Sequence, residues 1–357
     1  MATHGAHNVL SHRKFGCIHF AGVLCALVTI GGCGLEQSSL NPAGRGAKQI
    51  ADLFWYMTAG ATVIWLVVVG LFVYAIHYCP LPHNDRRSRL TVIGGGVVVP
   101  TIVLTGLLAY GLSLLPELQA PAQEGSLMVD VEGIQYWWRV RYPNPAKMPP
   151  SESTPNALLR NDLFIETANE IVLPVGQEVE FRLRGEDVIH SFWIPSIGGK
   201  VDMMPGRVNR LKLAPTRVGR YRGVCAEYCG ESHAMMAFDV RVVEPDEFDA
   251  WLMRQSEPAV APMDEVANRG ARRFLAVGCG ACHAIRGTEA NGSFGPDLTH
   301  VGSRATIGAA TLVNDHAELA DWTRRPDLVK PGVLMPSFDH LSDKDIEAIT
   351  TYLKGLR

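Results

Sequence analysis

One short segment of the chain combines two thiols, an imidazole and a thioether: Cys225-Ala-Glu-Tyr-Cys229-Gly-Glu-Ser-His233-Ala-Met-Met236. His190 adds a second imidazole from further upstream. Sulfur ligands mixed with imidazole are suited to copper, whereas a thioether is a poor ligand for zinc. Two such thiolates can both bridge a pair of copper ions, with one histidine on each ion and Met236 as a weak ligand. A Cys225–Cys229 disulfide or a zinc knuckle would also account for the cysteines.

A second cysteine pair, in Cys279-Gly-Ala-Cys282-His283, is followed directly by a histidine. Cys-x-x-Cys alone is compatible with a redox dithiol or half of a zinc site, but the adjacent histidine is the attachment signature of a c-type haem. Both thiols would add to the haem vinyl groups, and His283 would become the proximal iron ligand. Met335 lies in a loop before a final stretch of helical periodicity. Residues 264–357 therefore resemble a small class I cytochrome c with Met335 as distal ligand, and this ligation raises the haem potential.

Two apolar runs precede these motifs and predict a membrane anchor. Phe54–Tyr78 and Leu90–Leu115 are each long enough to cross a hydrocarbon layer of about 30 Å. The loop between them contains three arginines, which favours the cytoplasmic side for this loop. A transmembrane hairpin is therefore expected over residues 50–116, with both of its ends on the outer side.

The first residues are typical of a secretory signal, with a basic start before the short apolar run Phe15–Ile30. Ile30-Gly-Gly-Cys33 resembles a bacterial lipoprotein cleavage box, in which the cysteine becomes the lipidated first residue. We therefore expect residues 1–32 to be removed and Cys33 to carry lipid. An ordinary signal or an uncleaved anchor is the alternative.

The remaining composition separates the outer part into a β-rich and a helical region. From residue 125 to about 243, alternating apolar and charged residues predict half-buried strands, and therefore a β-sandwich or small barrel. Residues 247–263 are acidic and proline-rich, which predicts a linker. We expect His300, His316 and His340 at the surface. The net charge of −3 gives no support for binding nucleic acid.

Four motifs follow the two apolar spans, in this order: Gln135-Tyr136-Trp137-Trp138, Asp187-Val-Ile-His190-Ser-Phe, Lys200-Val-Asp202-Met-Met-Pro-Gly-Arg207 and the cysteine segment. Over about residues 45–245 this order resembles subunit II of cytochrome c oxidase. The resemblance implies a cupredoxin domain over residues 120–246 that holds the binuclear copper-A centre. The ligands that it implies are His190, Cys225, the backbone carbonyl of Glu227, Cys229, His233 and Met236. It also places the Glu227 side chain on a magnesium ion shared with subunit I.

The chain departs from this family at two places. The aromatic cluster usually begins with tryptophan, whereas this sequence has Tyr136, so the ring that passes electrons to copper A is Tyr136, Trp137 or Trp138. The second span of the family often carries a glutamate near the mouth of a proton path. Residues 89–99 contain no carboxylate, so we assign this chain no role in proton uptake.

The complete pattern resembles subunit II of a caa3-type oxidase, a multidomain membrane protein with a two-helix transmembrane hairpin, a β-sandwich cupredoxin domain and an all-α class I cytochrome c domain. The resemblance implies that electrons pass from a donor, such as a cytochrome c or a cytochrome complex, through haem c and copper A to subunit I. Oxygen chemistry would belong to subunit I, so no catalytic residue is expected here. Partners would include subunits I and III, in the bacterial inner membrane, with both large domains on the periplasmic side. A copper-A nitric oxide reductase and a copper-delivery module are the alternatives.

Overall fold

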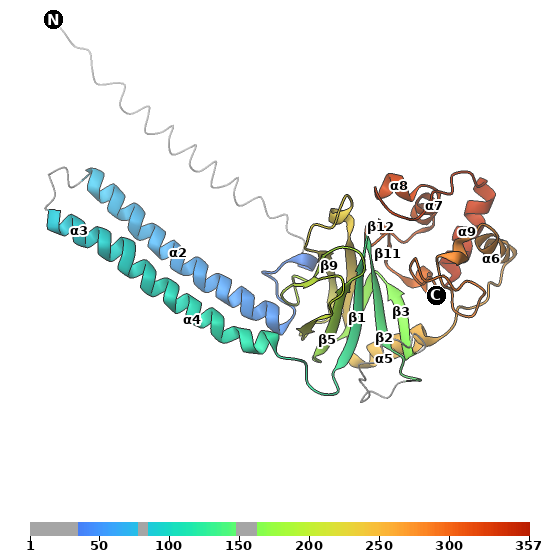
Figure 1. Ribbon diagram of the computed structural model, residues 1–357, viewed down its shortest axis with the longest axis horizontal. Coiled ribbons are helices and arrows are strands. Elements are labelled where there is room, and N and C mark those ends of the chain that lie inside the picture. Colours follow the sequence, from blue (N-terminus) through green and yellow to red (C-terminus); the bar gives the residue numbers. More distant parts are fainter. Residues whose placement is uncertain (1–34, 78–84, 148–162) are drawn as a thin grey trace, which may run out of the picture.

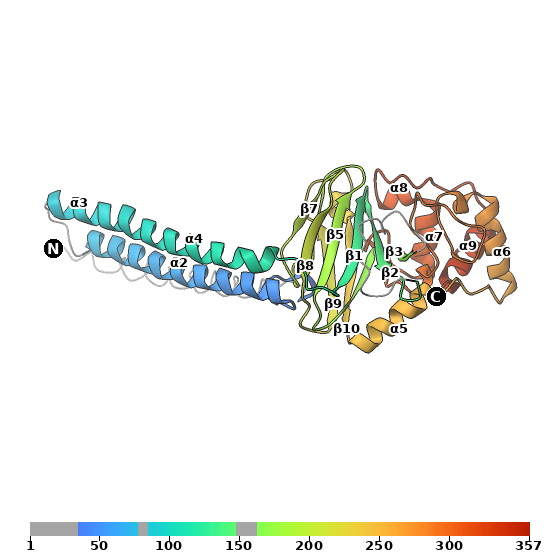
Figure 2. The ribbon, with the colours of Figure 1, turned by 60° about the horizontal axis from the view of Figure 1, so that its bottom comes forward.

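The computed structural model describes residues 35–77, 85–147 and 163–357. These residues form a helical hairpin, a β-sandwich and a helical C-terminal domain, which follow one another along the long axis of the molecule (Figure 1). The hairpin projects from the side of the sandwich opposite to the C-terminal domain, and the view in Figure 2 agrees. The predicted signal, residues 1–32, and Cys33 lie outside the described residues.

The hairpin consists of two long apolar arms. The first arm is α2 (Arg45–His77), and the second runs without interruption through α3 (Asp85–Ile93), the π turn η2 (Gly94–Val98) and α4 (Val99–Gln119). Both arms are long and apolar enough to cross a membrane, by length and composition. The first arm includes residues 54–77 of the predicted span Phe54–Tyr78, whose last residue lies outside the described residues, and the second arm contains all of Leu90–Leu115. Both arms continue beyond the predicted spans at their sandwich ends.

The π turn lies where the sequence is least suited to a regular α-helix. Pro100, in the first turn of α4, has no backbone N–H, and its ring crowds the carbonyl four residues earlier. Gly94, Gly95 and Gly96 form the preceding turn, and a Cβ on any of them would meet no atom within 4 Å. The wider turn therefore accommodates the proline while the helix continues.

The β-sandwich confirms the prediction for the central region. One sheet has the order β3-β2-β1-β5-β8, and its strands are β1 (Leu127–Ile134), β2 (Trp137–Pro143), β3 (Phe164–Ala168), β5 (Val179–Gly185) and β8 (Asn209–Leu213). The other has the order β4-β10-β9-β6-β7, and its strands are β4 (Glu170–Pro174), β6 (His190–Trp193), β7 (Val201–Met203), β9 (Gly219–Cys225) and β10 (Ala237–Val243). The pairs β1–β5 and β4–β10 are parallel, and the other strand pairs are antiparallel.

Aromatic side chains fill the space between the two sheets. The ring centroid of Phe238 lies 4.9 Å from that of Phe192 and 5.0 Å from that of Trp138. All three side chains are fully buried. The Trp138 ring also lies 6.3 Å from the imidazole of His190. The packed core therefore fixes the position of a predicted metal ligand at the start of β6.

The segment ahead of α2, residues 35–44, attaches the hairpin to the sandwich. This segment contains the short 3-10 helix η1 (Leu35–Gln37). The backbone N–H of Ala43 donates to Ser196 O at 2.6 Å, and that of Arg45 donates to Ala214 O at 3.0 Å. A Cβ on Gly44 would lie 2.2 Å from the carbonyl oxygen of Ile197, so this close approach requires glycine. The first turn of α2 is thereby fixed on the sandwich.

The predicted linker over residues 247–263 was wrong in its first half. Residues Pro245–Ser256 form α5, and only residues 257–263 are extended. Phe248, Trp251 and Leu252 have the spacing of one helical face, and all three are buried against the sandwich. The acidic residues that indicated a linker lie in the first turn, where they stabilise the helix N-terminus.

The C-terminal domain is helical, as predicted. Its elements are α6 (Glu265–Ala276), η6 (Cys279–Ala281), η7 (Val301–Ser303), the short strands β11 (Thr306–Ile307) and β12 (Leu312–Val313), α7 (His316–Arg324), α8 (Pro326–Val329) and α9 (Asp343–Gly355). Helices α6 and α9 pack closely at Gly270, where a Cβ would lie 1.9 Å from the carbonyl oxygen of Ala348. The hydroxyl of Ser342 caps α9 by accepting from Asp345 N–H.

Candidate metal centres

The sulfur atoms of the predicted copper loop, residues 225–236, lie together in the structure. Cys225 ends β9, Cys229 lies in the following loop, and Met236 directly precedes β10. Cys229 Sγ is 3.8 Å from Cys225 Sγ and 3.8 Å from Met236 Sδ. A disulfide would need about 2 Å between the sulfurs, so both thiols are free. A hydrogen bond from Cys229 lowers the pKa of Cys225, and a thiolate is the form that binds a metal.

Each cysteine has its own histidine. The Nδ1 atom of His190 lies 3.8 Å from Cys225 Sγ, and the Nδ1 atom of His233, in η5 (His233–Met235), lies 3.6 Å from Cys229 Sγ. The carbonyl oxygen of Glu227 is 3.2 Å from Cys225 Sγ. All six predicted ligand groups therefore converge on one cluster, and their soft sulfur and imidazole donors fit copper.

Asp187 orients the buried imidazole of His190. Its Oδ1 atom lies 2.9 Å from His190 Nε2, and its Oδ2 atom accepts from Gln135 N–H at 2.7 Å. On the other side, a Cβ on Gly133 would lie 2.8 Å from the ring. These contacts leave Nδ1 facing the sulfur atoms, as a second-shell carboxylate does in many metal sites. Asp187 was not predicted as a site residue, although its spacing of three residues from His190 was a usable signal.

A cavity of about 210 Å³ in the C-terminal domain is lined by all four predicted haem residues: Cys279, Cys282, His283 and Met335. His283 Nδ1 lies 2.8 Å from the carbonyl oxygen of Pro296, so Nδ1–H donates to it and Nε2 is left for the iron. Burial lowers the pKa of His283, which favours the neutral, ligating form. The donor set fits a covalently attached haem.

Three further predictions concern this domain. His316 and His340 are exposed, but His300 is only 5 % exposed, so the surface prediction for His300 was wrong. Its Nε2 atom lies 3.1 Å from the carbonyl oxygen of Glu257, so the extended segment after α5 covers this imidazole.

Arg304 is buried and lines the cavity, and its Nε has no hydrogen-bond partner among the residues described. This donor fits a propionate of a bound haem.

The copper domain supplies part of the cavity wall. Gln135, Tyr136 and Trp137 all line it. The same segment reaches the copper loop, because Gln135 Nε2 donates to Cys229 O at 2.6 Å and Tyr136 Oη accepts from Glu231 N–H at 3.0 Å. Two of the three candidate electron-accepting rings thus face the haem cavity. Trp138 instead lies in the core of the sandwich.

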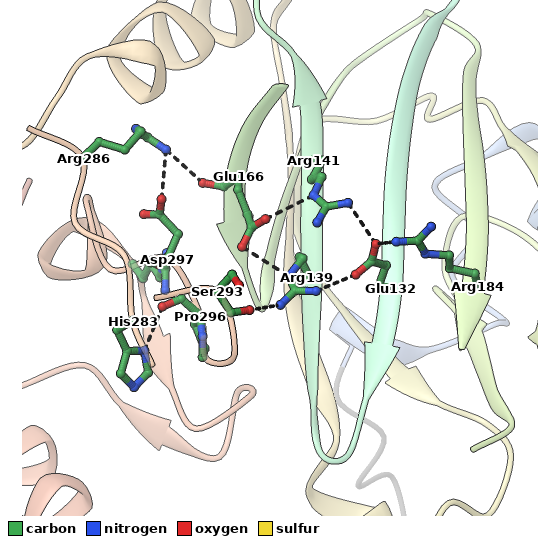
Figure 3. Close-up of polar contacts among 11 residues, drawn as sticks. Glu132, Arg139, Arg141, Glu166, Arg184, His283, Arg286, Ser293, Pro296 and Asp297 are labelled. Atoms are coloured by element: carbon green, nitrogen blue, oxygen red, sulfur yellow. Dashed lines mark hydrogen bonds and ion pairs between the residues drawn. The ribbon is translucent and has the colours of Figure 1, made fainter. Parts of the chain in front are cut away.

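A network of ion pairs joins the outer face of the first sheet to the C-terminal domain (Figure 3). Glu132 lies at its centre and accepts from Arg139 at 2.7 Å, from Arg141 at 2.9 Å and also from Arg184. Burial by itself raises the pKa of Glu132, but these guanidinium groups outweigh it and the pKa lies below its ordinary value. Arg139 continues across the domain boundary and donates to Ser293 O at 2.5 Å.

Arg286 makes the return contact from the C-terminal domain. Its guanidinium donates to Glu166 O at 3.3 Å and to the carboxylate of Asp297 at 3.3 Å (Figure 3). It also donates to Gln255 O, at the end of α5, at 2.5 Å. Because Asp297 follows the Pro296 carbonyl that orients His283, the network ends beside the predicted proximal haem ligand.

The fold and the two ligand clusters define an electron-transfer protein, in which a cupredoxin-type copper domain is joined to a cytochrome c. Residues 127–243 match the family "Cytochrome C oxidase subunit II, periplasmic domain", and residues 267–357 match "Cytochrome c". The chain is 31 % identical over 344 residues to cytochrome c oxidase subunit 2 of Alkalihalophilus pseudofirmus, a match that covers 91 % of this chain and 93 % of the relative. It is 30 % identical over 369 residues to the same subunit of Bacillus subtilis, covering 94 % and 97 % of the two chains.

This chain belongs to the cytochrome c oxidase subunit II family and carries a fused cytochrome c domain. Its cofactors are copper A and haem c. The family and the two apolar helices place it in a membrane.

Proposed function

We propose that this chain relays electrons from an external donor through haem c and then copper A to subunit I of a haem-copper oxidase. One observation supports direct transfer between the two centres: residues 135–137 form part of the haem cavity wall, and two of them, Gln135 and Tyr136, also hydrogen-bond the copper loop. Copper A therefore has the haem cavity as its neighbour inside the same chain. The external donor reduces the haem, and subunit I takes electrons from the copper side.

The residues of the chain hold and insulate the two centres. Cys225, Cys229, His190, His233, Met236 and the Glu227 carbonyl hold copper A; Cys279, Cys282, His283 and Met335 hold the haem. When bound, these groups supply one-electron redox chemistry, and the protein sets their position and potential. Both copper-loop cysteines are buried, so water is excluded from the cluster. The packed core behind His190 limits rearrangement when the charge changes.

The surface around the copper loop supports a docking role toward subunit I. The side chain of Glu227 is exposed, and Tyr228 is 75 % exposed beside it. We assign to Glu227 the magnesium ion shared with subunit I. The hairpin contacts subunit I within the bacterial inner membrane, with both large domains on the periplasmic side and subunit III in the same complex. Oxygen reduction and proton translocation take place in subunit I.

Stopped-flow reduction of the two centres tests the relay in the intact complex. Cys279→Ala together with Cys282→Ala should abolish oxidation of the natural donor while copper A remains in place, because the copper ligands belong to the sandwich. A small reductant that reaches copper A directly should then still support oxygen consumption. Cys229→Ser removes a sulfur ligand of copper A. In this variant the donor should still reduce the haem, and the haem should stay reduced because copper A no longer accepts its electrons.

Copper and haem analysis of the same samples provides the control. The wild-type chain should contain two coppers and one covalent haem. Turnover of the Cys229→Ser complex at the wild-type rate would refute the serial order, and stoichiometric zinc in the wild type would refute the copper assignment.

A further inference from the structure

A buried lysine lies between the two domains. Lys330 follows α8 and is only 1 % exposed. Its Nζ atom donates to Tyr136 O at 2.6 Å, to Met235 O at 2.9 Å and to Gly308 O at 2.9 Å. Two of these carbonyls belong to the copper domain, one on the aromatic segment and one directly before the ligand Met236. No carboxylate within the described ranges forms an ion pair with this ammonium.

The three carbonyl acceptors around Nζ favour the charged ammonium form of Lys330. An ammonium has three N–H donors, whereas a neutral amine has only two. Burial lowers the pKa of Lys330 to about 7, and three carbonyl oxygens aimed at Nζ oppose the loss of its proton. A buried cation is tolerated only where such bonds replace its water. The three bonds are therefore the condition for burying this residue, and two of them need the copper domain.

The residues after Lys330 lie on the copper loop. Ser232 Oγ donates to Pro331 O at 2.6 Å. A Cβ on Gly332 would lie 3.0 Å from Glu231 Oε2, and the φ of this glycine is 76°. Val333 packs against the core of the sandwich. Met335, the distal haem ligand, comes two residues later. The loop that carries a haem ligand is thus held on the loop that carries the copper ligands.

We propose that Lys330 is a positioning residue for electron transfer between the domains: it holds the Met335 loop and the haem cavity against the Tyr136–Trp137 segment and the copper loop. The inference rests on the proposed relay. In that step one electron leaves the haem iron and arrives at copper A, while no covalent bond or proton changes place. Because electron transfer depends on the separation of the centres, a looser contact slows this step without altering either centre.

The test compares variants of the full chain in the assembled oxidase. Lys330→Met keeps an apolar side chain of similar length but leaves three carbonyls without their donor. Lys330→Gln keeps an amide NH₂ group with two N–H donors and is the milder change. Lys354→Met is the matched control, because Lys354 Nζ also donates to carbonyls, Asn314 O at 2.7 Å and Gly302 O at 3.4 Å, but only within the cytochrome domain.

The rate of copper A reduction by prereduced haem is measured by stopped flow. Lys330→Met should slow it by on the order of tenfold, since the loss of three hydrogen bonds at the domain contact weakens the docked state. Lys330→Gln should slow it less, and Lys354→Met should not slow it. Copper content, both optical spectra and the haem reduction potential should remain as in the wild type, which separates positioning from damage to a centre.

A second readout needs no electron transfer. A specific protease site is introduced at Met263, which is 94 % exposed at the end of the extended segment. After cleavage, the cytochrome domain should stay bound in the wild type and in Lys354→Met and dissociate in Lys330→Met. Wild-type transfer rate and retention in Lys330→Met would overturn the positioning role alone. Failure of haem to reduce copper A in the wild type would instead overturn the proposed relay.

Discussion

Replacement of Asp187 by alanine should weaken copper binding without removing any ligand. The carboxylate is 31 % exposed, whereas the imidazole that it orients is fully buried. Asp187→Ala removes the acceptor at 2.9 Å from His190 Nε2 and the acceptor of Gln135 N–H at 2.7 Å. Loss of such a second-shell partner lowers metal affinity by about 10- to 100-fold, which corresponds to about 1.4 to 2.8 kcal/mol.

Two further variants separate orientation from charge. Asp187→Asn keeps one oxygen acceptor, which can serve His190 or the backbone of Gln135 but not both, so its affinity should be intermediate. Glu186→Gln removes a carboxylate from the neighbouring, exposed position and should leave copper binding unchanged.

Copper retention is measured by titrating the purified chain with a competing chelator while its copper absorption and paramagnetic spectrum are followed. The four proteins should rank in the order wild type and Glu186→Gln, then Asp187→Asn, then Asp187→Ala. Equal retention in Asp187→Ala and the wild type would show that the sandwich alone fixes the imidazole, and the orientation argument would then be wrong.

Three other expectations follow from single features. Gly270→Ala places a Cβ 1.9 Å from the carbonyl of Ala348 and should destabilise the cytochrome domain by about 1–3 kcal/mol in thermal unfolding, whereas Gly355→Ala, with open space around its Cβ, should not. The guanidinium groups around buried Glu132 hold its pKa below 4.5, so their stabilisation is present above pH 4.5 and is lost as pH falls through the lower folded-state pKa; Glu132→Gln should therefore flatten the acid side of the stability profile, and an unchanged profile would contradict this. Mass spectrometry of the mature chain should find lipid on Cys33 as the first residue, and an unmodified Cys33 would rule this out.

The ligand clusters were accessible from the sequence because their chemistry is local. Four of the predicted copper-binding side chains lie within one short segment, and the Cys279–His283 motif forms another, so residue type and spacing were sufficient for these two predictions. His190 lies outside that segment; it was included as a second imidazole donor, and the resemblance of its surrounding motif supports this choice. The strand alternation that predicted the sandwich is likewise a local, period-two signal.

The domain contact was not accessible, because no local pattern encodes it. Lys330 lies 194 residues from Tyr136 in the chain, and a single lysine is usually a surface residue. Asp187 stood inside a motif that was used only for its histidine. Helix α5 was missed because its acidic residues and flanking prolines outweighed the spacing of Phe248, Trp251 and Leu252.

The shared cavity wall has a kinetic consequence. Electron transfer between two separate proteins begins with a diffusional encounter, whose rate depends on ionic strength because surface charges steer it. Lys330 and Tyr136, whose carbonyl it binds, are both buried, so salt has little access to this part of the contact between the two domains. In the proposed relay, the step from the external donor to the haem should therefore respond to ionic strength, whereas the inner step should not. Because the two domains are fused and in contact, electron transfer between them needs no diffusional encounter.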